Sequence, residues 1–256
     1  MLPGYKLFGI LPLYFSFHAV AVIALLVLLL SVCKHYGISP LKTAVGAASL
    51  SAAAYLWMMV LWWAATGFRV FGGQNFVRVF VWVPLFTVLV AKLLKVDWRS
   101  LCDMVAPCLT LAFGIGHIAC IFAGCCYGFE SPHGVYNAVY HKYLFPVQLW
   151  EAGTALAITA FLLYIMKRRN YKTNGWLYPI MLVLFGSTRF FWEFFRNNEK
   201  IIGQVSELAL WALASFVVGA VWLIVLKAKE ERQNTSSDLH RAAVGDDYTE
   251  QAIQDR

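Results

Sequence analysis

Long apolar stretches alternate with short polar connections along most of the chain. Seven of these stretches are close to the roughly 20 residues that a helix needs to cross a bilayer. Their approximate bounds are Phe8–Val32, Ala44–Thr66, Phe76–Leu94, Cys102–Gly124, Leu149–Met166, Gly175–Phe195 and Val205–Leu226. The pattern predicts an all-α polytopic membrane protein with seven transmembrane helices.

Composition agrees with this prediction. Hydrophobic residues make up 60% of the 256 residues and charged residues only 14%, whereas a globular domain carries about 25% charged residues. The first stretch lacks a basic start and a small-residue cleavage site, so it is expected to be a helix and not a signal peptide. From Lys227 the chain turns polar. We therefore expect a transmembrane domain over 1–229 and a flexible cytoplasmic tail over 230–256.

The distribution of cations predicts the orientation. The connections on one side of the membrane, with the adjoining helix ends, would hold a third of the 21 Lys and Arg residues, namely Lys6, Arg69, Arg78, Lys142, Arg189, Arg196 and Lys200. The other side would hold the remaining two thirds and is therefore cytoplasmic, which places the N-terminus outside. The net charge of +7 is thus mainly a topology signal, and no nucleic acid is expected as a partner.

Three charged residues lie in the sixth stretch or directly after it. Arg189, Glu193 and Arg196 lie within about 60° of one another on a helix of 3.6 residues per turn. An ionised side chain near the bilayer centre costs about 2.5–3.5 kcal/mol, so this face meets protein or water. Because one acid leaves one cation over, an anionic partner is favoured. The alternative is an ion pair that holds two helices together, with Arg196 extending to the interface.

The fourth stretch carries Asp103 and His117 on one continuous face, beside a surface of small residues formed by Gly116, Cys120 and Gly124. Asp103 is expected to cap the start of its own helix. His117 lies deeper in the stretch and faces the bundle. It is either a hydrogen-bonded packing residue or a catalytic group, and its position alone does not separate the two.

Two adjacent cysteines follow in the segment 124–128. None of the six cysteines forms a Cys-x-x-Cys pair, so no metal site is predicted. Cys125 and Cys126 are packed thiols, a redox-active pair, or thiols that work in a site. Further along, Gln148 and Glu151 share one face at the start of the fifth stretch. Glu151 either complements the helix N-terminus or has a functional role.

The order of motifs is similar to that of a known family. The motifs are Gly72-Gly73, Leu101-Cys-Asp103-Met-Val-Ala-Pro107, Gly114-Ile-Gly116-His117-Ile, Gly124-Cys-Cys-Tyr-Gly128, Pro146-Val-Gln148-Leu-Trp-Glu151-Ala, Arg189-Phe-Phe-Trp-Glu193-Phe-Phe-Arg196 and Gly203-Gln204-Val-Ser206. Over roughly residues 60–222 the chain resembles the prolipoprotein diacylglyceryl transferase family. The resemblance implies a multi-pass enzyme of the bacterial inner membrane that needs no cofactor. Such enzymes transfer the diacylglyceryl group of phosphatidylglycerol to the lipobox cysteine of a prolipoprotein and release glycerol phosphate.

The resemblance also implies a set of site residues. Arg189 and Arg196 match the late arginines of the family, and Gln148 and Glu151 match a Pro-x-Gln-Leu-Tyr-Glu element in which Trp150 replaces tyrosine. The candidate catalytic residues are His117, Glu151, Arg189, Cys125 and Cys126. The candidate substrate-binding residues are Arg196, Glu193, Gln148, Gly72, Gly73, Gly124, Gly128 and Gln204.

The chain departs from the family signature Gly-Arg-x-Gly-Asn-Phe-x-Asn-Gly-Glu. Its segment 116–125 has His117 in place of the arginine, Cys120 and Ala123 in place of the asparagines, and Cys125 in place of the glutamate. Three functions follow. The first is a divergent transferase in which His117 is the base or a phosphate donor. The second is a thiol-dependent acyl or alkyl transferase that uses Cys125 or Cys126. The third is a non-catalytic lipid-binding or transport protein.

Overall fold

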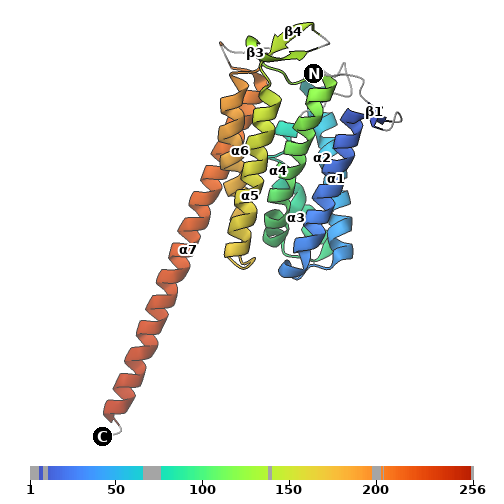
Figure 1. Cartoon of the computed structure of the whole chain (residues 1–256). Helices are drawn as coiled ribbons and strands as arrows, with labels where there is room; N and C mark the ends of the chain where they lie inside the picture. The colour runs from blue at the N-terminus through green and yellow to red at the C-terminus, as the bar shows by residue number, and fades with distance from the viewer. Residues whose placement is uncertain are drawn as a thin grey trace.

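The structure is a computed structural model that describes residues 6–7, 11–65, 76–137, 140–197, 203 and 205–254. Within these residues it contains seven α-helices (Figure 1). The helices are α1 (Leu13–Val32), α2 (Pro40–Ala65), α3 (Val83–Leu94), α4 (Trp98–Ala123), α5 (Val147–Arg168), α6 (Leu177–Glu193) and α7 (Glu207–Gln254). The short elements are β1 (Lys6–Leu7), β2 (Leu11–Pro12), β3 (Glu130–Asn137), β4 (Lys142–Leu144), η1 (Cys33–Tyr36) and η2 (Phe76–Arg78).

Within the described residues, five helical segments are long and apolar enough to cross a membrane. They are Leu13–Tyr36, Pro40–Leu61, Trp98–Ala123, Val147–Arg168 and Glu207–Ser236. This confirms the all-α membrane class. The third predicted helix is shorter than expected, because the chain forms η2 and turns before α3 begins at Val83. The 12 residues of α3 span only about 18 Å at 1.5 Å per residue.

The central helix of the bundle is α4, which contacts α1, α3, α5 and α6. Its close approach to α5 depends on Gly114, where an added Cβ would lie 2.9 Å from Leu156 Cγ and 3.2 Å from the Ala152 carbonyl oxygen. The α6–α7 contact is closer still. A Cβ on Gly186 would lie 2.6 Å from the Phe216 nitrogen. Small residues thus let backbones meet, as is common between transmembrane helices.

The expected role of Asp103 was wrong. Asp97 caps α4 instead, because it has an extended backbone one residue before the helix and accepts a 2.9 Å bond from the Ser100 amide. Asp103 lies further along α4 and is fully buried. It accepts bonds from the amides of Gly175 (2.7 Å) and Leu177 (2.9 Å). It therefore fixes the start of α6, and through α6 the position of Arg189.

The two ends of the bundle differ. β3 and β4 pair as an antiparallel hairpin above the ends of α4 and α5, and we call this the hairpin end (Figure 1). At the opposite end α7 projects well beyond the other helices (Figure 1). Its backbone is helical through Gln254, so the region expected to form a flexible tail continues α7 as a helix. The domain division at residue 230 stays a prediction.

Candidate functional site

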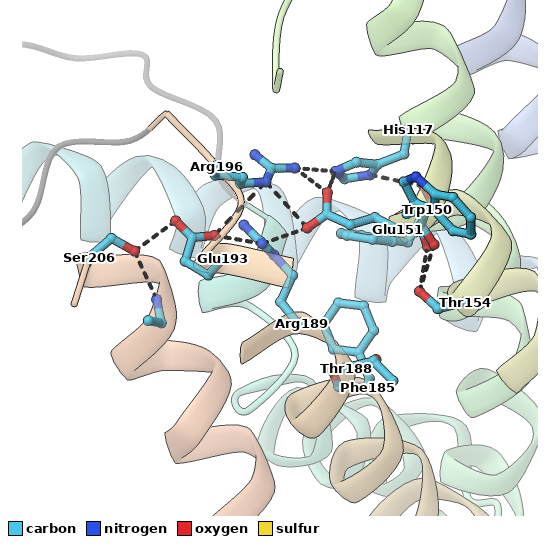
Figure 2. Close-up of polar contacts among 12 residues, drawn as sticks. His117, Trp150, Glu151, Thr154, Phe185, Thr188, Arg189, Glu193, Arg196 and Ser206 are labelled. Carbon is cyan, nitrogen blue, oxygen red and sulfur yellow. Dashed lines mark hydrogen bonds and ion pairs between the residues drawn. The ribbon is translucent and has the colours of Figure 1, made fainter. Parts of the chain in front are cut away.

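Four segments bring charged side chains together at the hairpin end of the bundle. His117 comes from α4, Glu151 from α5, Arg189 and Glu193 from α6, and Arg196 from the turn that follows α6 (Figure 2). We call these five residues the buried cluster. The predicted face of Arg189, Glu193 and Arg196 is confirmed, although Arg196 lies beyond the last residue of α6.

Glu151 is the central acceptor of the buried cluster. Its Oε1 accepts a 2.5 Å bond from Arg189 Nη1 and a 3.2 Å bond from Arg196 Nε. Its Oε2 accepts a bond from Arg196 Nη2 and lies 3.2 Å from His117 Nε2. Only 2% of Glu151 is exposed. Its carboxylate thus contacts side chains from three different segments.

Glu193 connects the buried cluster to α7. Its Oε2 lies 2.6 Å from Arg189 Nη1 and 3.9 Å from Arg196 Nε. Its Oε1 accepts a 2.7 Å bond from Ser206 Oγ, which in turn accepts a 3.2 Å bond from the Ala209 amide in the first turn of α7. Sequence analysis did not select Ser206 as a site residue, although it ends the quoted motif 203–206 and precedes an apolar run as a helix cap does.

The charges of the buried cluster balance. Arg189 and Arg196 face the two carboxylates of Glu151 and Glu193. The expectation of an unpaired cation was therefore wrong. The second acid is Glu151, which lies on α5 and cannot be seen from the residues of α6 alone. Arg196 is enclosed by these partners, and only 6% of it is exposed. Buried charges are tolerated when they are paired in this way.

Arg189 keeps one donor unused. Its Nε is buried and has no hydrogen-bond partner among the described residues. Arg189 and Glu151 also line a narrow cleft between α4, α5 and α6, together with Phe113, Thr154, Ala155, Phe185, Thr188 and Trp192. The cleft is narrow, so a ligand enters it only if the surrounding side chains move.

The segment 124–129 holds Arg196 in place. Gly128 pairs with Arg196, and the Phe129 amide donates a 3.2 Å bond to the Phe195 carbonyl. A Cβ on Gly128 would lie 2.5 Å from that same carbonyl oxygen. Gly128 is therefore needed for close backbone approach. Gly124, with φ of 68°, ends α4 in the left-handed conformation that glycine adopts easily.

Of the remaining predicted site residues, some lie near the buried cluster and others fall outside the described residues. Gln148 is fully buried, and its Nε2 donates a 3.4 Å bond to the Cys125 carbonyl. Cys125 and Cys126 are free and partly exposed. They precede Gly128 by three and two residues, and the backbone of Gly128 pairs with Arg196 of the buried cluster. Gly72, Gly73 and Gln204 lie outside the described residues.

The comparison with known families settles the relationship. The family model for prolipoprotein diacylglyceryl transferase matches residues 44–225, a range that includes the whole buried cluster. The chain belongs to this family. The departures at His117, Cys120 and Cys125 are thus variations inside a family member.

Curated relatives carry the same description. The phosphatidylglycerol--prolipoprotein diacylglyceryl transferase 2 of Clostridium perfringens (strain 13 / Type A) is 30% identical over 153 residues, which are 56% of this chain and 58% of that protein. A phosphatidylglycerol--prolipoprotein diacylglyceryl transferase of Clostridium tetani is 31% identical over 120 residues, or 44% of this chain and 47% of the relative. One of Francisella tularensis subsp. tularensis is 28% identical over 174 residues, covering 62% and 63%. In each case the match spans less than two thirds of the relative.

Proposed function

We propose that the protein is a divergent transferase that moves a diacylglyceryl group from a phosphatidylglycerol-like phospholipid to a cysteine thiol, with a lipobox-bearing prolipoprotein as the acceptor. Family membership and the names of the relatives support the reaction class. The observation that carries the proposal is the buried cluster, in which Glu151 orients two arginines and His117 at the hairpin end.

The reaction needs a proton acceptor and a site for the phosphate. The thiol sulfur attacks the glyceryl carbon, a C–S bond forms, and the C–O bond to the phosphate breaks with its electron pair on the phosphate oxygen. The thiol proton has to be removed before or during this step. We propose that His117 accepts the thiol proton and that Arg189 and Arg196 bind the phosphate.

His117 lies between possible partners for both of its ring nitrogens. Its Nδ1 lies 3.2 Å from the Phe113 carbonyl oxygen, so Nδ1 carries the proton in the neutral ring. Its Nε2 then accepts from Arg196 Nη2 at 3.1 Å. The protonated ring would instead donate from Nε2 to Glu151 Oε2 at 3.2 Å. The Nε2 atom thus has an acceptor within reach when the ring takes up the thiol proton.

To bind the phosphate, the arginines exchange carboxylate partners for phosphate oxygens. Arg189 and Arg196 each present a planar fork of donors that fits phosphate oxygens. Both are occupied by Glu151 and Glu193 in the structure, so the lipid phosphate competes with carboxylates for them. His117 cannot supply the permanent charge of the family's arginine at this position. We therefore expect weak affinity for the lipid headgroup.

The proposed orientation completes this function. We place the hairpin end outside and the end of α7 in the cytoplasm of a bacterium, in a multi-pass arrangement of seven helices in the inner membrane. The Lys and Arg distribution supports this orientation. The family's substrates, a phospholipid and an exported prolipoprotein, would then both meet the buried cluster from the outer side.

The test is reconstitution of the full chain with phosphatidylglycerol and a lipobox peptide, followed by mass spectrometry of the peptide. We expect a diacylglyceryl thioether on the peptide cysteine. Arg189→Ala should abolish turnover, whereas Lys142→Ala, which breaks only the exposed pair with Glu130 at the hairpin, should retain it. A fully active Arg189→Ala variant, or no product from folded wild-type protein beside an active family member, would contradict the proposal.

A further inference from the structure

Three cysteines that are separated in sequence meet where α4 ends. Gly124 ends the helix in a Schellman motif, in which the Gly124 amide donates to the Ile121 carbonyl and the Cys125 amide donates to the Cys120 carbonyl at 3.2 Å. This motif folds the chain back by one turn. It brings Cys125 back to Cys120, so that Cys125 Sγ lies 3.8 Å from the Cys120 carbonyl oxygen.

Cys126 completes the group. Its φ of 60° is unusual for a residue with a side chain, and it allows two adjacent side chains to turn toward the same point. The sulfur atoms of Cys120, Cys125 and Cys126 all lie within 4.8 Å of one another. Tetrahedral ligands held at about 2.3 Å from a zinc ion lie about 3.8 Å apart. The three thiols thus need only a small adjustment to share one ion.

The surroundings suit a thiolate–metal complex. Three thiolates and a divalent cation together carry one net negative charge. Gln148 fixes the backbone of Cys125 through its carbonyl. All three cysteines are partly exposed. A packing role predicts full burial, as at Cys33, Cys102 and Cys108.

The group has three ligands and not four. Among the residues that the structure describes, no further His, Cys, Asp or Glu side chain joins it. Structural zinc sites are closed by four protein ligands, whereas catalytic sites use three and keep the fourth position for water or substrate. A thiol that enters that position binds as a thiolate.

We propose that Cys120, Cys125 and Cys126 bind one Zn²⁺ ion through three thiolates and leave a fourth position that accepts the thiol of an incoming cysteine peptide. Loading releases three thiol protons per ion to the solvent, and coordination of the peptide thiol releases a fourth, the proton that the proposed function assigns to His117. No oxidant or reductant is needed. The use of this thiolate in C–S bond formation rests on the proposed function, because it is the same sulfur that would attack the glyceryl carbon.

Metal binding is measured without any assay of activity. The full chain is purified reduced in detergent, loaded with Zn²⁺ or Co²⁺ and desalted, and its metal content is determined by elemental mass spectrometry. We expect one ion per chain and, with Co²⁺, thiolate-to-metal charge-transfer absorption. Cys126→Ser should weaken binding by about 100-fold or more, since even loss of an outer-shell partner costs 10–100-fold. Cys108→Ser, at a buried thiol elsewhere in α4, is the matched control and should bind as the wild type does.

The open position is tested by adding a lipobox peptide with either cysteine or serine to the Co²⁺ form. Only the cysteine peptide should change the absorption spectrum. Equal metal content in Cys108→Ser and in the Cys120→Ser, Cys125→Ser and Cys126→Ser variants would overturn the proposal. So would a Cys120–Cys125 or Cys125–Cys126 disulfide that persists in reduced protein. Zinc uptake by protein that never lipidates the peptide would instead refute only the proposed function.

Discussion

Glu151 is the residue on which the buried cluster depends most. Its two oxygens face Arg189, Arg196 and His117, and the charge balance of the cluster requires it. The same carboxylate also sets the orientation of both arginine forks. A single substitution at this position is therefore expected to affect both folding and the proposed phosphate site.

Glu151→Ala should destabilise the protein strongly. Removal of one partner from a buried ion pair typically costs about 3–5 kcal/mol, because the remaining charge stays desolvated and unpaired. Thermal unfolding in detergent measures this. The matched control is Glu130→Ala, which breaks an exposed pair with Lys142 and should leave the midpoint unchanged because exposed pairs contribute little. Equal midpoints for the two variants would contradict the central role of Glu151.

Ser206 offers a milder test of the same cluster. Its hydroxyl donates to Glu193 and accepts from the Ala209 amide, so Ser206→Ala removes a helix cap and one carboxylate donor. Loss of a cap costs about 0.5–2 kcal/mol. We expect a lower unfolding midpoint and reduced turnover. Ser187→Ala, on the exposed side of α6, is the control. Unchanged stability of Ser206→Ala would refute this connection to α7.

At the scale of the elements, two aspartates fix the starts of two different helices. Asp97 caps α4, and Asp103 binds the amides at the start of α6. Asp103 accepts two amides and the Thr173 hydroxyl in a fully buried place, whereas Asp97 caps α4 where the surface is exposed. Asp103→Ala leaves buried donors unsatisfied, at about 1–3 kcal/mol each. It should lower the unfolding midpoint clearly more than Asp97→Ala. The reverse order would contradict the assignment of Asp103 to the start of α6.

Two glycine-to-alanine substitutions test how closely the helices must approach each other. Gly186→Ala places a Cβ against the backbone of α7, 2.7 Å from the Ala212 carbonyl oxygen, and should separate α6 from α7 and disturb the contact of Glu193 with Ser206. Gly153→Ala meets nothing within 4 Å and should be neutral or slightly stabilising, since alanine favours helix. Unfolding midpoints and turnover of both variants test this. A neutral Gly186→Ala would show that the two helices can separate freely.

At the scale of the whole molecule, α7 extends far past the bundle (Figure 1). The buried cluster lies at the hairpin end, and the polar continuation of α7 projects from the opposite end. Removal of residues 237–256 should therefore leave the unfolding midpoint and the activity unchanged. Loss of activity with an intact midpoint would assign a function to this segment.

Much of the fold could be predicted because transmembrane helices are local features. A run of apolar residues forms a helix in a bilayer whatever its neighbours are, since its backbone bonds close within the run. The predicted ranges accordingly match α1, α4, α5 and α6 to within a few residues, apart from the later start of α1. The 3.6-residue period also placed Arg189 and Glu193 on one face. α3 was overestimated because hydropathy does not detect the turns before Val83.

The sequence by itself determined the membrane class, the helical faces and the family motifs, because each depends on residues close together in the chain. Only the tertiary structure decided that Glu151 neutralises the surplus cation of α6 and that Asp103 caps α6 and not α4. Those partners lie on different helices, and their contact depends on how the helices pack. The cysteine group lies between these cases: a glycine cap is visible in the sequence, but the convergence of three sulfur atoms follows from the backbone turn that it produces.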